Sequence, residues 1–118
     1  MIEVEINEER DGRISAFSVH GHSGTAPKGR DIVCAGVSAL AQTALLGLGR
    51  YLHRDGDYHI EPSGDLHMKL REAPDDFTEA ILRTMCLGLD EIKKYSHGAV
   101  RLRIQRENPG GEGHEFYV

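Results

Sequence analysis

The sequence has only two cysteines among its 118 residues, Cys34 and Cys86, and neither belongs to a CxxC pair. A secreted scaffold of this length that depended on disulfides would normally contain more cysteines. The first residues, MIEVEINEERDGR, also lack the basic start and the apolar run of a secretory signal. These absences predict a reduced protein of the cytoplasm.

Positive charge is also scarce in this sequence. Lys and Arg number 14 against 19 Asp and Glu, which gives a formal net charge of −5. A surface that binds nucleic acid by replacing counterions needs clustered Lys and Arg, so we expect no direct nucleic-acid partner. A basic protein partner would suit this charge balance better.

Charge is missing altogether from one segment, Ile32 to Gly49. Its 18 uncharged residues reach the lower limit of a membrane-spanning length. However, the segment contains three glycines, many of its apolar residues are only alanine, and Ser38, Gln42 and Thr43 are polar. We therefore expect no membrane span, and predict a helix that is buried or lies at a subunit interface.

Turn signals and apolar periodicity divide the chain into seven expected elements. Alternation of apolar and polar residues predicts strands, and Asp11-Gly12 is a strong hairpin signal. Asp31 is a good cap for a first helix, and Pro74 opens a second. The expected elements are strands at 2–6 and 13–19, a helix to about 52, strands at 55–60 and 66–70, a helix from about 75 and a strand at 99–104.

The order ββαββαβ predicts an α/β (α+β) fold with one mostly antiparallel sheet packed with two helices. We assign this single domain to residues 1–106. The tail at 107–118, ENPGGEGHEFYV, is rich in glycine and charge, and we expect it to be disordered.

The stretch HGHSGTAPKGRDIVC, residues 20–34, contains the main candidates for chemistry. Cys34 is the third residue after the expected cap Asp31, so it lies in the first turn of a helix. Unsatisfied backbone N–H groups and the positive end of the helix dipole favour a thiolate there, and a thiolate is the reactive nucleophile. A packed cysteine, or a metal ligand together with His20 and His22, fits the same position.

A cysteine nucleophile needs a base close by, and His20 and His22 both precede the helix. Strand alternation points these two histidines to the same side, so their spacing cannot choose between them. Asp31 has a sufficient role as a cap, and it could also orient an imidazole. Ser38 lies one helical turn after Cys34, where it could line the same site.

Cofactor motifs are absent from the sequence. The glycines of the 20–30 loop are not followed by the Lys-Ser/Thr of a phosphate-binding loop, and GxGxxG does not occur. The HxH beside the helix cysteine lacks a fourth metal ligand at the usual spacing. We therefore expect no metal and no cofactor. Cys86 follows Met85 on an apolar helix face, where it is expected to pack in the core, which disfavours a thiol redox protein.

As a unit, Gly21-His22, eight intervening residues and DIVCAGVSAL at 31–40 resemble the ribosomal-processing cysteine protease family of bacteria, Prp (YsxB-like). Histidine, aspartate, cysteine and serine all fall in place together in this block. The resemblance covers the order of elements to about Arg106. His20 lies outside the family pattern, so the resemblance favours His22 as the base.

The resemblance implies a role for each candidate residue. Cys34 would be the nucleophile and His22 its base, so that the two form a Cys-His dyad. Gly21, Asp31 and Ser38 match positions that support the site in this family. Members of the family are homodimers.

The resemblance also implies a substrate. Members of the family remove a short N-terminal extension from large-subunit ribosomal protein twenty-seven during ribosome assembly, cutting after an aromatic residue. A basic ribosomal protein is a sensible partner for an acidic enzyme. The alternative is a non-catalytic ribosome-associated interaction module that dimerises through the apolar first helix.

Overall fold

The computed structural model describes residues 1–21 and 32–107, together with the backbone of 113–117. Helix α1 continues directly into a π-helical turn, η1, so the helical segment ends at Tyr51, one residue before the expected end. The elements are β1 Ile2–Glu8, β2 Ile14–Gly21, α1 Ile32–Leu46, η1 Gly47–Tyr51, β3 Gly56–Ile60, β4 Leu66–Leu70, α2 Asp76–Tyr95, β5 Val100–Glu107 and β6 Gly113–Tyr117.

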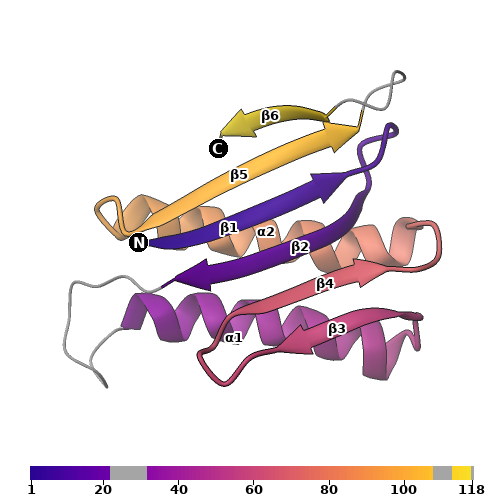
Figure 1. Ribbon diagram of the computed structural model, residues 1–118, viewed down its shortest axis with the longest axis horizontal. Coiled ribbons are helices and arrows are strands. Elements are labelled where there is room, and N and C mark those ends of the chain that lie inside the picture. The colour runs from indigo at the N-terminus through magenta and orange to yellow at the C-terminus, as the bar shows by residue number, and fades with distance from the viewer. Residues whose placement is uncertain (22–31, 108–112, 118) are drawn as a thin grey trace.

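The six strands form one sheet in the order β3-β4-β2-β1-β5-β6. Neighbouring strands run antiparallel, with the exception of β1 and β5, which run parallel. Figure 1 shows α1 and α2 side by side behind the sheet, so that they leave its front face uncovered. The predicted α+β fold, a mostly antiparallel sheet packed with two helices, is confirmed, and the predicted order ββαββαβ is followed by one further strand, β6.

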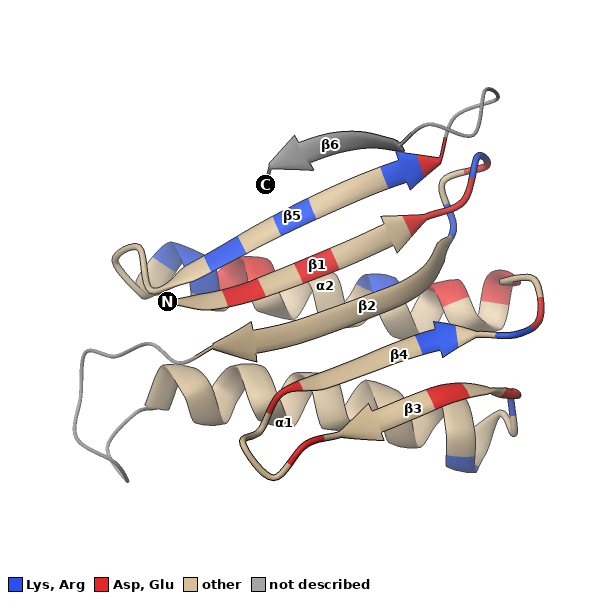
Figure 2. Ribbon diagram, viewed as in Figure 1, with Lys and Arg blue, Asp and Glu red and all other residues tan. Residues whose placement is uncertain are grey.

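The parallel pair β1 and β5 is lined with opposite charges on its two strands (Figure 2). The ion pairs are Glu3–Arg101, Glu5–Arg103 and Glu8–Arg106. A slip of one residue would turn the side chains of one strand to the other face and separate these charges. The ion pairs therefore favour the observed register, which joins the first expected strand to the last.

The core lies between the helices and the inner face of the sheet. Alternate strand residues point into it, as the apolar and polar alternation predicted, and those of β1 are Ile2, Val4 and Ile6. The buried residues of α1 are Val37, Ala41, Ala44 and Leu45. The sheet thus has an apolar face under the helices and a polar face toward solvent.

Helices α1 and α2 pack closely because small residues of one meet large residues of the other. The facing pairs are Gly36 with Ile92 and Leu40 with Gly88, followed by Gly47 of η1 with Ile81. An added Cβ at Gly88 would lie 2.9 Å from Leu40 Cδ1, which is closer than carbon atoms normally approach. The glycines of the uncharged segment therefore allow two helices to share one side of a single sheet.

By length and composition alone, Ile32–Tyr51 could also cross a membrane. The core helix of a globular protein has the same properties, and buried side chains such as Val37, Ala41 and Leu48 pack α1 and η1 into the core of this domain. The apolar residues on the inner side of the helix are therefore explained by their packing in the core.

The expectation of a disordered tail is wrong for Gly113–Tyr117, which forms strand β6. This strand pairs antiparallel with residues 103–107 of β5, which itself extends to Glu107. Without β6, the outer side of β5 would present a row of unpaired backbone N–H and C=O groups. The glycine and charge content of the tail does not reveal this pairing, because β6 forms against the open edge of β5.

Glu8 is a buried carboxylate held between two arginines. Its side chain is only 3% exposed, and its oxygens accept from Arg83 Nη2 at 2.9 Å and Arg106 Nε at 2.8 Å. Glu8→Ala would leave both guanidinium groups without this partner, and we expect a loss of about 2–3 kcal/mol in the free energy of unfolding. Urea denaturation measures this change.

The matched control for Glu8 is Glu3→Ala on the same strand. The Glu3–Arg101 pair is about half exposed, with an N···O distance of 3.5 Å. An exposed pair of this kind contributes less than about 1 kcal/mol. Equal losses of stability in the two variants would contradict the role assigned to Glu8.

Candidate active site

Cys34 is the third residue of α1, as its distance from the expected cap predicted. Its side chain is partly buried and packs against the core. Within Ile32–Leu46, no acidic side chain lies in the first turn, where the backbone N–H groups form the positive end of the helix dipole. The start of α1 therefore stabilises negative charge on the sulfur.

Cys34 also lines a cavity of about 260 Å³. Residues of β1, β2, α1 and the β3–β4 turn form its walls, and they are Ile2, Val19, Gly21, Cys34, Ala35, Val37, Ser38, Ser63 and Gly64. Most of these side chains are small or aliphatic. The volume lies below the roughly 300–1,000 Å³ of typical small-molecule sites, so the cavity suits a single side chain of a larger ligand.

Three of the predicted site residues meet at this cavity. Gly21, Cys34 and Ser38 all line it, although Gly21 belongs to a strand and the other two to a helix. The Ser38 hydroxyl oxygen accepts from Gln42 Nε2 at 2.7 Å, which leaves its own O–H able to donate. The other two predicted site residues, His22 and Asp31, lie outside the described residues.

Gly21 ends β2 in a conformation that favours glycine. Its φ angle is +91°, and a Cβ at this position would collide with the carbonyl oxygen of Met1. The Gly21 N–H donates to Asp65 Oδ1 at 3.2 Å. Both the backbone angle and the close approach of β1 therefore require a residue without a side chain here.

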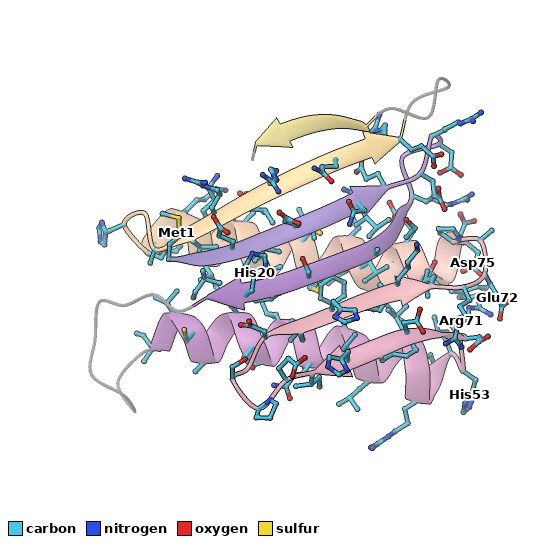
Figure 3. All side chains as sticks on the ribbon, viewed as in Figure 1. Met1, His20, His53, Arg71, Glu72 and Asp75 are labelled. Carbon is cyan, nitrogen blue, oxygen red and sulfur yellow. The ribbon has the colours of Figure 1, made fainter. Side chains whose placement is uncertain are left out.

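His20, the rival base, lies on the other side of the sheet from the cavity. Figure 3 shows its side chain on the front face, away from the helices. Its Nε2 lies 3.2 Å from Glu3 Oε2, on the face opposite to the buried Ile2 and Val4. The structure therefore does not bring His20 to Cys34.

The β3–β4 turn contributes to the cavity although it was not among the predicted site residues. Ser63 and Gly64 of this turn line the cavity together with Ile2 and Val19 of the sheet. No local pattern marks such residues, because they reach Cys34 through the pairing of β2 with β4 and with β1. Predicting these cavity residues requires the order of the strands in the sheet, which the sequence patterns do not supply.

Cys86 packs in the core, as its helix position predicted. It is buried among apolar residues of α2, and burial raises the pKa of its thiol to about 11. It therefore stays protonated and unreactive near neutral pH.

Within residues 1–21 and 32–107, no group of three or more His, Cys, Asp and Glu side chains is arranged to hold a metal ion.

The profile of the family described as cysteine protease Prp matches residues 1–101. The chain belongs to the Prp cysteine protease family. The resemblance carried by Gly21-His22 and residues 31–40 is thereby confirmed.

Curated relatives and solved structures of the Prp family agree with this assignment. The ribosomal processing cysteine protease Prp of Staphylococcus aureus, in two strains, is 30% identical over 108 residues, which cover 89% of this chain and 100% of the relative. A crystal structure of S. aureus Prp with a covalently linked product peptide superposes with a TM-score of 0.82 at 27% identity, covering 88% of this chain and 99% of that one. A second, with a substrate peptide, has a TM-score of 0.77 at 26% identity and the same coverage.

Proposed function

We propose that this Prp-family chain is a cysteine endopeptidase that acts through a dyad of Cys34 and His22. The observation that carries the proposal is the position of Cys34, in the first turn of α1 and at the wall of a cavity. The covalently linked product peptide in a relative favours a covalent mechanism. The opposite orientation of His20 supports His22 as the base.

The proposed reaction proceeds by acyl transfer. His22 takes the thiol proton, and the Cys34 sulfur attacks the carbonyl carbon of the scissile peptide bond. Backbone N–H groups at the start of α1, including that of Cys34, stabilise the resulting oxyanion. His22 then protonates the leaving amine, the C–N bond breaks, and water hydrolyses the thioester to release the acid and restore the thiol.

The supporting residues have separate tasks in this proposal. Gly21 lets β2 and β1 approach each other at the cavity, and the Ser38 hydroxyl offers a hydrogen bond one turn along α1. Asp31 caps the helix. No metal or cofactor has a step in this mechanism.

We propose that the substrate is the N-terminal extension of large-subunit ribosomal protein twenty-seven, cut after an aromatic residue. The name of the S. aureus relative, a ribosomal processing protease, supports a ribosomal substrate. Aliphatic walls around Cys34 suit an apolar side chain next to the scissile bond. The net charge of −5 suits a basic protein.

The proposed enzyme is a homodimer. Support comes from the outer side of the helices, where a groove between α1 and α2 is lined by residues such as Leu40, Ala44 and Ile81. Tyr51 also lines this groove and is 80% exposed, and Leu87 of α2 is a further large apolar side chain, 65% exposed. Exposed apolar surface of this kind is typical of an interface. The cytoplasmic location stays a prediction.

The test of the proposed function is incubation with the full-length ribosomal protein, followed by intact-mass analysis. We expect two products whose masses add up to that of the substrate plus one water, with the cut in the N-terminal extension after an aromatic residue. An unchanged substrate mass, together with no alkylation of Cys34 by iodoacetamide at neutral pH, would instead favour the non-catalytic interaction module.

A further inference from the structure

Strand β2 extends beyond the strand that pairs with it on one side. Strand β4 begins at Leu66, which lies opposite Val19, so Gly21 has no ladder partner in β4. Its N–H donates instead to the carboxylate of Asp65, the residue just before β4, at 3.2 Å. The Asp65 side chain thus accepts the hydrogen bond that a backbone carbonyl of a longer β4 would accept, and it holds the end of β2.

Asp65 itself is held by a compact turn between β3 and β4. The Glu61 N–H donates to the Asp65 carbonyl oxygen at 2.7 Å, and the Gly64 N–H donates to the Glu61 carbonyl oxygen at 2.9 Å. Gly64 has a φ angle of +99°, and the Asp65 N–H points at Ser63 Oγ at 3.3 Å. The carboxylate is therefore presented to Gly21 from a hairpin with little freedom to move.

The same turn faces the candidate nucleophile. Ser63 and Gly64 line the cavity with Cys34 and Gly21, so the turn contacts both the cavity and the end of β2. The next residue after Gly21 is His22, bonded to it directly. Whatever holds the Gly21 backbone therefore holds the residue that directly precedes the proposed base, at the wall of the Cys34 cavity.

We propose that Asp65 is a positioning residue of this enzyme, whose hydrogen bond to the Gly21 N–H holds the end of β2, next in sequence to the proposed base, at the cavity that Cys34 lines. This inference rests on the proposed dyad. Asp65 does not touch the reacting atoms; it acts through the backbone of Gly21. Small displacements of a catalytic group lower the reaction rate strongly. A misplacement of about 1 Å can reduce the rate on the order of a hundredfold.

The test compares Asp65→Ala with Asp65→Asn, using ribosomal protein twenty-seven as substrate. Alanine removes the acceptor, and we expect kcat to fall on the order of tenfold to a hundredfold with KM nearly unchanged. Asparagine keeps an acceptor oxygen at the same place without the charge, so it should restore most of kcat. The pH profile of Cys34 alkylation by iodoacetamide should shift in Asp65→Ala toward that of His22→Ala, and stay close to wild type in Asp65→Asn.

The matched control is Glu61→Ala, which removes another carboxylate of the same turn. The Glu61 carboxylate pairs with His59, at a distance of 2.6 Å from His59 Nε2 to Glu61 Oε1. We expect Glu61→Ala to leave kcat unchanged. Circular dichroism and thermal unfolding would verify that each variant folds. Wild-type kcat in Asp65→Ala, or equal losses in the alanine and asparagine variants, would overturn the positioning role.

Cys34→Ala, assayed in parallel, separates the failure of this inference from that of the proposed function. If Cys34→Ala is inactive and Asp65→Ala is fully active, only the role of Asp65 is refuted. If Cys34→Ala cleaves as well as wild type, the dyad itself is refuted and the role of Asp65 with it.

Discussion

Cys34→Ala is expected to abolish cleavage of the ribosomal protein, with a loss in kcat of about 10³-fold or more. Alanine removes the sulfur that forms the thioester, and the hydroxyls of Ser38 and Ser63 in the described cavity are much weaker nucleophiles than a thiolate at neutral pH. Because Cys34 is only partly buried, the fold should tolerate the change. Intact-mass analysis of the substrate over time measures the loss.

The matched control for Cys34 is Cys86→Ala, which removes the other thiol and should leave kcat near that of wild type. Iodoacetamide gives a second comparison in the wild-type protein. Cys34 should be alkylated at neutral pH, whereas Cys86 should resist because burial raises its pKa to about 11, so little thiolate exists there. Full cleavage by Cys34→Ala would contradict the nucleophile assignment.

His22→Ala should reduce kcat by about 10²–10⁴-fold, because general-base catalysis contributes a factor of that size. His20→Ala is its natural control, two residues earlier in the chain. The His20 ring lies on the outer face of the sheet beside Glu3, so its loss should leave kcat unchanged. Initial rates with the ribosomal protein, taken across a range of pH, compare the two variants.

Comparing kcat of His20→Ala and His22→Ala shows which of the two histidines is the general base. A large loss in His20→Ala with none in His22→Ala would mean that the assignment of the base is wrong. The pH profile adds a further check, since removal of the base should flatten the rise of kcat/KM on the acidic side of the optimum.

Much of this fold could be predicted from local patterns in the sequence. The alternation in residues 2–6 and 99–104 marks strands that are buried on one side, and both strands occur there. The spacing from the expected cap placed Cys34 in the first turn of a helix, where the structure has it. These features depend on residues close together in the chain, so periodicity and capping rules detect them.

The remaining features depend on contacts between distant residues. The parallel pairing of β1 with β5 brings residues about one hundred positions apart into register, and Ile2 joins the cavity only because β1 lies beside Gly21. The pairing of β6 with β5 joins neighbouring segments, but it requires an open strand edge that composition does not show. The Asp65 contact to Gly21 likewise exists only once β4 lies beside β2.

The approach of Met1 to Gly21 has a practical consequence for handling this protein. The Met1 carbonyl oxygen occupies the space that a side chain at position 21 would need, so the first residue of β1 lies at the edge of the cavity. An affinity tag fused to Met1 would therefore emerge beside the cavity that Cys34 lines. Strand β6 lies at the other side of the sheet from β3 and β4 (Figure 1), so a tag fused at the opposite terminus is the better choice for activity assays.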